Sequence, residues 1–218
     1  MGSANQAVTP GRSTLLDAVN VCLQNIGEQP VNTLESQQVS EAAMAERTLL
    51  EFHREGQTRG WSWNTEHGLR FYKDTATGGI TVPANVVRWS ADPYEWAGRF
   101  QLRGQRVYDL EKHTFQLADI QSLEADVTLL LSWDDSPEAF NRWITIRAAR
   151  VFSDRVLSSD SLFRFTAVDE QQAMTELHRV ELEQSQPNSL TGGPGLRPFP
   201  TYSPGLGLLG RNRGWLRG

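Results

Sequence analysis

The side chains best suited to catalysis or metal binding are scattered along this sequence. None of its four histidines occurs in a metal-binding spacing such as HExxH: His53, His67, His113 and His178. Glu51, His53 and Glu55 are close in sequence, but alternate residues of a helix point in different directions. No phosphate-binding glycine loop and no G-x-S-x-G nucleophile motif occurs. The sequence therefore predicts no metal site, no cofactor and no catalytic residues.

Asp134 and Asp135, beside Trp133, are the residues that most resemble a catalytic pair. Glycoside hydrolases use two carboxylates together with aromatic platforms for the sugar. The two aspartates directly precede Ser136 and Pro137, where acidic residues favour the start of a helix through the helix dipole. That structural role is a sufficient explanation, so a polysaccharide or cell-wall hydrolase is the alternative and a non-enzymatic protein is the preferred hypothesis.

The composition allows one large domain or two small ones. The chain has 218 residues, of which 39% are hydrophobic, and it contains seven tryptophans and nine phenylalanines. Core packing is the first interpretation of these aromatics, and contact between subunits is the alternative.

The single cysteine and the N-terminal residues bear on the compartment in which the chain folds. Cys22 lies at helical spacing with apolar neighbours, so we expect a buried thiol and folding in the reducing host cytoplasm. Residues 1–12 are small and polar, which predicts a disordered segment and not a secretory signal. No apolar run approaches the length needed to cross a bilayer, so we expect no contact with membrane.

Charge is distributed unevenly along the chain. Residues 186–218 contain four arginines and no acidic residue, whereas residues 1–185 contain 17 basic and 26 acidic residues, a net charge of −9. The overall net charge of −5 argues against a general nucleic-acid-binding protein. An acidic body with a basic arm favours an arm that docks on an acidic protein surface.

The elements begin with a predicted pair of helices. Thr14 and Asp17 form a capping box, and Gly27 and Pro30 end the first helix. Its apolar positions recur at helical spacing: Leu15, Leu16, Val19, Leu23 and Ile26. A second helix is predicted over 37–55, ended by Gly56 or Gly60. The short linker predicts that the two helices pack as a hairpin.

Residues 65–133 are predicted to form a small, mostly antiparallel sheet. Short runs with alternating or apolar patterns are bounded by glycine and proline. The predicted strands cover 68–72, 80–82, 86–89, two strands within 100–110 that turn near Gly104, 113–117, and 126–133, which is the strongest.

Two more helices are predicted after the sheet. Ser136, Pro137 and Glu138 have the residue types of a helix start. The third helix carries an apolar stripe: Phe140, Trp143, Ile144, Ala148, Val151 and Phe152. Its arginines are first interpreted as a solvated face, with subunit contacts or inter-helix ion pairs as alternatives: Arg142, Arg147, Arg150 and Arg155. A fourth, acidic helix is predicted over 166–183, with Ala173, Leu177, Val180 and Met174 on its apolar side.

The resulting prediction is an α+β protein. A four-helix bundle-like domain is built from 13–64 and 134–185, a β-rich insertion spans 65–133, and 186–218 form an interaction arm. Glycine and proline make up 13 of the 33 positions of the arm. Its predicted subunit or partner contacts are Arg197, Phe199, Tyr202, Leu208, Leu209, Arg211, Arg213 and Trp215. An arm folded back on its own domain and a disordered tail are the alternatives.

Three blocks of sequence carry a family resemblance. They are Ala18-Val19-Asn20 through Asn25-Ile26-Gly27-Glu28-Gln29-Pro30-Val31-Asn32-Thr33-Leu34-Glu35, then Arg59-Gly60-Trp61 with Asn64, and Pro137-Glu138-Ala139-Phe140-Asn141-Arg142-Trp143-Ile144. The chain resembles the tail tubular protein A family, the head-to-tail adaptors of short-tailed, T7-like bacteriophages. The resemblance covers about 15–72 and 133–180, and residues after 186 have no counterpart in it.

The resemblance implies a structural virion protein. It implies a ring of about twelve copies between the portal protein and a tail tubular protein B-like nozzle, through which genomic DNA passes without sequence-specific binding. The acidic body suits such a channel, because a negative wall repels phosphate. A virion-associated hydrolase is the rival hypothesis, and a DNA-binding protein is a third, which the negative charge disfavours.

Overall fold

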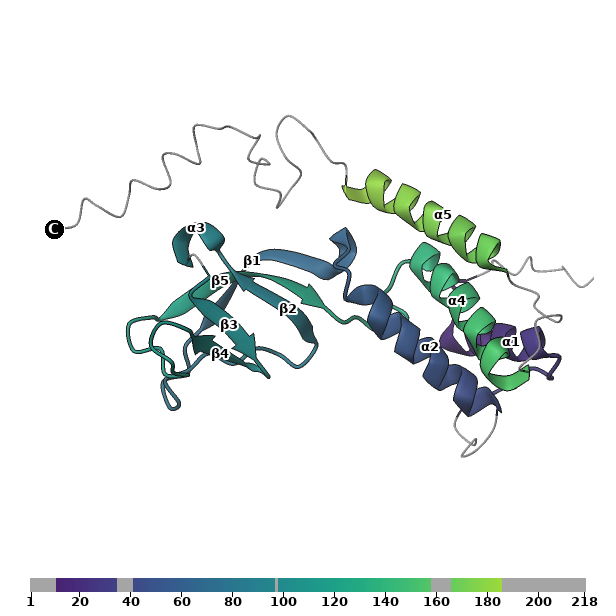
Figure 1. Ribbon diagram of the computed structural model, residues 1–218, viewed down its shortest axis with the longest axis horizontal. Helices are drawn as coiled ribbons and strands as arrows, with labels where there is room; N and C mark the ends of the chain where they lie inside the picture. Colours follow the sequence, from purple (N-terminus) through teal and green to yellow (C-terminus); the bar gives the residue numbers. More distant parts are fainter. Residues whose placement is uncertain (1–10, 35–40, 97, 158–165, 186–218) are drawn as a thin grey trace, which may run out of the picture.

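The computed structural model describes residues 11–34, 41–96, 98–157 and 166–185. The described chain is elongated, with four long helices at one end and the strands at the other (Figure 1). The chain crosses between these ends twice, once through residues 58–64 and once through residues 130–137. The molecule is therefore α+β, as the sequence predicts.

Helix α1 (Leu15–Ile26) has the ends that the sequence predicts. The Thr14 hydroxyl accepts a hydrogen bond from the Asp17 backbone N–H, and the Asp17 carboxylate accepts from the Thr14 backbone N–H, which closes the capping box. Gly27 follows with φ 87°, a left-handed conformation that costs glycine little.

Helix α2 (Glu41–Gln57) continues past Gly56, so the first of the two predicted ends is wrong. Gly60, the other predicted end, follows the helix by three residues with φ 78°. The reason for a glycine at position 56 is packing. A Cβ at position 56 would lie 2.9 Å from Cζ3 of Trp143 and 3.0 Å from Cε2 of Phe140. The missing side chain of Gly56 therefore makes room for two aromatic rings of α4. The predicted start of this helix, at residue 37, lies outside the described residues.

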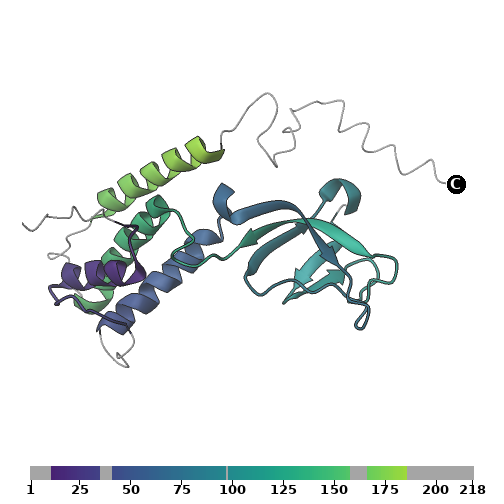
Figure 2. The same ribbon diagram turned by 180° about the vertical axis from the view of Figure 1, so that it is seen from behind.

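Helices α4 (Glu138–Leu157) and α5 (Ala167–Ser185) confirm the predicted third and fourth helices. The Thr166 hydroxyl bonds the Asp169 backbone N–H at the start of α5, and Asp169 bonds back to the Thr166 N–H. Helix α4 lies between α5 and the α1–α2 pair, as the view from behind also shows (Figure 2).

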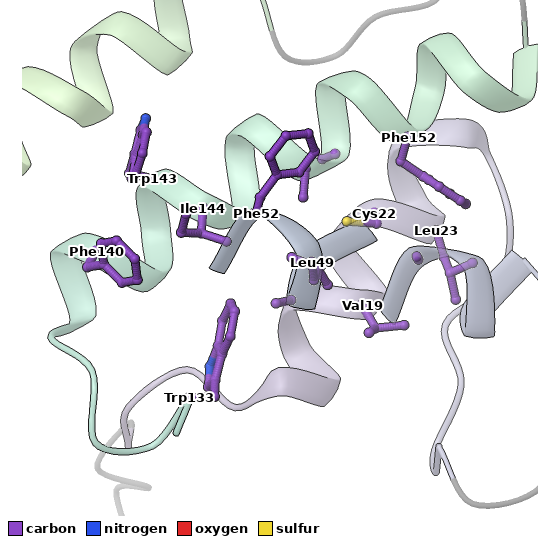
Figure 3. Packing of buried hydrophobic residues seen from close by; sticks show 14 of the residues in the cluster. Val19, Cys22, Leu23, Leu49, Phe52, Trp133, Phe140, Trp143, Ile144 and Phe152 are labelled. Atoms are coloured by element: carbon purple, nitrogen blue, oxygen red, sulfur yellow. The ribbon is translucent and has the colours of Figure 1, made fainter. Parts of the chain in front are cut away.

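The helical end has one hydrophobic core, drawn in Figure 3. Trp143 is 2% exposed, and Phe140, Phe152 and Cys22 are fully buried. Burial raises the pKa of the Cys22 thiol to about 12, so this cysteine is the inert thiol that the sequence predicts. The remaining members come from all four long helices and their flanks: Ala18, Val19, Leu23, Ala42, Ala45, Leu49, Phe52, Trp61, Trp133, Ile144, Ala148, Ala149 and Leu177.

The other end is built on a three-stranded antiparallel sheet. Strand β5 (Ser122–Leu129) lies in the centre, with β1 (Thr65–Tyr72) on one side and β2 (Val86–Ala91) on the other. Strands β3 (Phe100–Arg103) and β4 (Arg106–Asp109) form the predicted hairpin that turns at Gly104. The short helices η1 (Ser62–Asn64) and α3 (Pro93–Trp96) flank this part.

Several predicted strand boundaries are wrong. Strand β5 begins at Ser122 and ends at Leu129, so residues 130–133 leave the sheet. Residues 80–82 and 113–117 contribute single bridges, Thr81 to Arg106 and Thr114 to Asp109, and not strands. A second core fills this end: Phe71, Ile80, Val82, Val86, Trp89, Phe100, Val107, Leu117, Ile120, Leu123, Ala125 and Val127.

Candidate assembly surface

The residues singled out for chemistry are not brought together by the fold. His53 is 5% exposed and stacks on Trp133 with 5.2 Å between ring centroids. Glu51 and Glu55 point elsewhere and pair with arginines of α4. Among the described residues, no group of three or more His, Cys, Asp or Glu side chains could hold a metal ion.

Asp134 and Asp135 belong to the turn that leads into α4. The Asp135 carboxylate accepts a 2.6 Å hydrogen bond from the Ser132 hydroxyl. The Asp134 carbonyl accepts one from the Arg12 guanidinium. The hydroxyl of Ser136 donates to the Ser132 carbonyl at 2.9 Å. These bonds tie together the turn before α4, so the Asp135 side chain has a structural role there, and the proposed effect of the two aspartates on the helix dipole stays a prediction.

The predicted contact residues of the arm lie outside the described residues: Arg197, Phe199, Tyr202, Leu208, Leu209, Arg211, Arg213 and Trp215. Within the described chain, no helix is both long and apolar enough to cross a membrane.

The solvated face that is the first interpretation of the α4 arginines holds only in part, because Arg142 and Arg155 are exposed whereas Arg147 and Arg150 are half-buried. Arg147 lies 3.0 Å from a carboxylate oxygen of Glu55, and Arg155 lies 3.2 Å from one of Glu51, so both pair with α2. Arg150 lies 2.9 Å from Glu170 of α5. The alternative of inter-helix ion pairs is therefore right for these three. Because α4 is covered on two sides, side chains outside its apolar stripe still reach neighbouring helices.

Two of these arginines, Arg147 and Arg150, and a third, Arg59, line a hollow between α4 and α5, which we call the arginine groove. Its volume is about 360 Å³. Arg59 comes from the turn between α2 and η1. The groove is lined by Arg59, Trp143, Arg147, Arg150, Ala167, Glu170, Gln171 and Met174.

The base of the arginine groove is aromatic. Trp143 points from α4 toward α5 (Figure 3). The Arg59 guanidinium carbon lies 5.1 Å from the centroid of the Trp143 ring, and that of Arg147 lies 5.7 Å from it. Arg59 also approaches the Met174 sulfur at 3.9 Å. Cation–π attraction holds a guanidinium over an indole face. The Trp143 ring therefore positions the charges of Arg59 and Arg147 before any ligand or partner binds.

The charges of the arginine groove do not balance. Glu170 is the one carboxylate among the lining residues, and it pairs with Arg150. Glu55, outside the lining, pairs with Arg147. Arg59 is exposed and forms no ion pair within the described part of the chain. Among the described residues, the groove therefore presents a positioned positive charge without a paired carboxylate, on a chain whose residues 1–185 are acidic.

A buried polar network joins the two ends of the molecule. The Gln57 side chain accepts from the Leu131 backbone N–H at 2.7 Å and donates to the Leu131 carbonyl at 3.2 Å. The Asn64 amide donates to the carbonyls of Gln57 and Leu129. The side-chain amides of Gln57 and Asn64 thus connect the two segments of chain that run between the ends of the molecule. The sequence does not reveal this role.

His53 extends this network. The Gln57 amide nitrogen lies 3.0 Å from Nδ1 of His53 and donates to it, because the Gln57 oxygen is already bonded to Leu131. The Nε2 of His53 lies 3.1 Å from the Ser136 hydroxyl, to which it donates. This arrangement fits only the neutral ring, and burial lowers the pKa of His53 to about 4.

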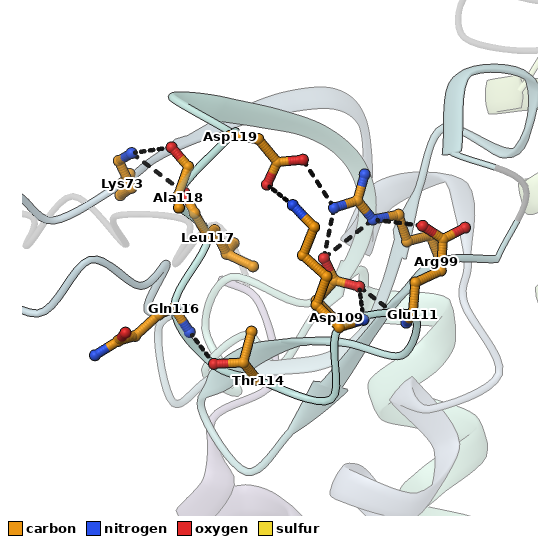
Figure 4. Close-up of polar contacts among 10 residues, drawn as sticks. Lys73, Arg99, Asp109, Glu111, Thr114, Gln116, Leu117, Ala118 and Asp119 are labelled. Carbon is orange, nitrogen blue, oxygen red and sulfur yellow. Dashed lines mark hydrogen bonds and ion pairs between the residues drawn. The ribbon is translucent and has the colours of Figure 1, made fainter.

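The β-rich end carries its own charge cluster. Arg99 donates to Asp109 at 2.6 Å and to Asp119 at 3.0 Å, and the Asp109 side chain is fully buried (Figure 4). The hydrogen bond from Arg99 lowers the pKa of Asp109. On the β3–β4 hairpin, Arg103 stacks on Tyr108, with its guanidinium carbon 3.7 Å from the ring centroid. These contacts hold the loops and the β3–β4 hairpin of the β-rich end in place.

Comparison with known proteins supplies a family. A family model described as a tail tubular protein matches residues 16–187. The match covers the whole sheet and all four long helices except the first residue of α1. No individual curated protein matches the chain.

Proposed function

This chain belongs to the tail tubular protein family, and we propose that it is a ring-forming adaptor between the portal and the tail nozzle of a bacteriophage. The family is a structural, non-enzymatic component of the phage tail, so the chain is a structural virion protein. The observation that carries the proposal is the family match, which runs without interruption through both cores.

The proposed assembly is a ring of about twelve copies, bound to the portal protein on one side and to a tail tubular protein B-like nozzle on the other. The elongated subunit supports this arrangement (Figure 1). Its helical and β-rich ends have separate cores, and we expect each end to contact a different neighbour.

We further propose that genomic DNA passes through the lumen of this ring and is gated there before ejection. The net charge of −9 over residues 1–185 supports a wall along which a duplex slides. A basic wall would retain DNA because phosphate contacts release counterions, whereas an acidic wall does not.

The domain division is part of the proposal. Residues 13–64 and 134–185 would form a bundle-like helical unit, and 65–133 a β-rich unit. The two separate cores support this division, and so does the amide network of Gln57 and Asn64, which fastens both crossings at one place. Residues 186–218 would act as the interaction arm.

Size-exclusion chromatography with light scattering tests the adaptor proposal. The full chain is measured alone, with the portal protein, with the nozzle protein and with both. We expect a complex of all three proteins that contains many copies of this chain. A chain that stays monomeric beside both proteins would rule the adaptor role out.

A further inference from the structure

We infer that the arginine groove receives carboxylate side chains from a second copy of this chain, and so forms one half of the contact between neighbouring subunits. The inference deepens the proposed function and rests on it, because it assumes that copies meet in a ring. It adds the residues of the contact and the chemistry of the group that they bind.

The groove is built before any partner arrives. Arg59 is held by the Trp143 ring at 5.1 Å and by the Met174 sulfur at 3.9 Å. Arg147 is held by Glu55 at 3.0 Å and lies over the Phe52 ring at 4.8 Å. Guanidinium groups bind carboxylates through paired, charge-assisted hydrogen bonds, and preorganised groups lose less entropy when they do so.

The charge of the groove selects an acidic partner. It is lined by three arginines and one glutamate. Residues 1–185 of every copy carry 26 acidic against 17 basic residues, so a second copy presents the complementary charge. Residues 186–218 of the same copy carry four arginines and no acid, so the arm would be repelled from this groove.

The shape of the groove also fits side chains. A hollow of about 360 Å³ over a buried tryptophan accommodates a few protruding groups. A DNA duplex presents its phosphates on a broad convex surface and is opposed by the net negative charge of the body. Neighbouring subunits in a ring meet through two different patches, so a groove on one copy and a protruding acidic patch on the next are the expected pair.

Substitution of Arg59 tests the inference, because this arginine has no ion-pair partner among the described residues. We compare Arg59→Glu and Arg59→Lys with Arg54→Glu, which reverses an exposed arginine on α2 outside the groove. Ring formation by the full chain, with portal and nozzle proteins present, should need about tenfold or more protein in Arg59→Glu. Arg59→Lys should be weakened less, and Arg54→Glu should match the wild type.

A cross-linking experiment identifies what occupies the groove. Gln171→Cys places a reactive thiol at its exposed rim, while the native Cys22 is buried and unreactive. The thiol is labelled with a short benzophenone maleimide, and the assembled complex is irradiated. We expect cross-links to acidic segments of a second copy, and none between copies from Met44→Cys, an exposed position outside the groove.

The outcomes separate the two proposals. A ring that forms equally well with Arg59→Glu, or a cross-link from position 171 only to another tail protein, to DNA or within its own copy, overturns the inference and leaves the adaptor role intact. A wild-type chain that forms no assembly with either partner overturns both. Circular dichroism melting curves establish that each variant folds, and the cross-linking result stands without Arg59 variants.

Discussion

His53 shows at the scale of one residue how this fold uses a titratable group without giving it chemistry. Its ring stacks on Trp133, meets Phe140 in an edge contact, and is hydrogen-bonded through both nitrogens. A proton on Nδ1 would face the Gln57 amide N–H, and that amide cannot turn round without losing both of its bonds to Leu131. The hydrogen bond from Gln57 to His53, at the junction between the two ends, therefore requires a neutral His53 ring.

The stability of the protein should consequently fall in mild acid. The pKa of His53 is about 4 in the folded protein and near 6.5 when the chain is unfolded, so the unfolded chain binds a proton that the folded one does not. The free energy of unfolding contributed by this group is fully present above pH 6.5. It should decrease by about 2 kcal/mol between pH 7 and pH 5.

Urea unfolding of the wild type and of His53→Gln at both pH values measures this effect. The variant should be less stable at pH 7 but show a flatter dependence on pH. An equal slope in the two proteins would mean that His53 does not carry the effect.

Trp143 makes a second prediction at the same scale. It is 2% exposed and contacts the core on one side and two guanidinium groups on the other. Trp143→Ala should lower the free energy of unfolding by about 3–5 kcal/mol through the cavity it leaves. Chemical denaturation measures the loss, and a value below about 1 kcal/mol would contradict the burial described.

At the scale of elements, α4 organises the helical end. It contacts α1, α2 and α5, and its arginines pair with acids on two of these helices. The close approach of α2 at Gly56 depends on the absence of a side chain there. Close packing against α4, and not termination of α2, therefore explains the glycine at position 56.

Gly56→Ala separates these two roles. Alanine favours a helix by about 1 kcal/mol over glycine, but its methyl group would lie 3.0 Å or less from Trp143, Phe140 and Ile144 side-chain atoms. Overpacking of this kind costs about 1–3 kcal/mol, so we expect a net loss of stability. A gain of about 1 kcal/mol would show that the helices can move apart.

A double-mutant cycle supplies the control for Gly56→Ala. Ile144→Val removes the Cδ1 atom that lies 3.0 Å from the new methyl group. The two substitutions together should destabilise the protein by less than the sum of their separate effects.

The helices could be predicted from the sequence because their signals are local. The Thr14–Asp17 box, Gly27 and the start at Glu138 are all recognisable in a few residues. The end of β5 could not be predicted. Residues 130–133 are apolar like a strand, but Leu131 is bonded by Gln57 of α2 and Trp133 packs into the helical core.

The arginine groove could not be predicted from local sequence signals either. The spacing of Arg147, Arg150 and Arg155 places them off the apolar stripe, but their acidic partners lie on α2 and α5, far away in sequence. Arg59 belongs to a block that carries the family resemblance, but that block does not indicate what its side chain contacts. It joins the arginine groove only because the turn after α2 brings it over Trp143. The arginine groove depends on contacts between residues that are far apart in sequence. The periodicity of a single helix gives no information about such contacts.

At the scale of the whole molecule, the uneven charge suggests how copies assemble. The acidic residues 1–185 and the basic residues 186–218 belong to the same chain, so we expect attraction between the basic segment of one copy and the acidic body of another. We propose that the arm and the arginine groove are separate contacts of the ring.

Truncation after Ser185 tests the arm. The shortened chain should keep the thermal melting temperature of the full chain, because both cores lie before residue 186. Its assembly, measured by light scattering with portal and nozzle proteins, should be weakened. Unchanged stoichiometry and affinity would show that the arm contributes no contact.

Electron microscopy of the full chain mixed with the portal and nozzle proteins tests the central claim most directly. The adaptor account predicts an annular layer of this chain between the two, with an open channel along the axis. A portal bound directly to a nozzle, with this chain left as solitary particles, would contradict it.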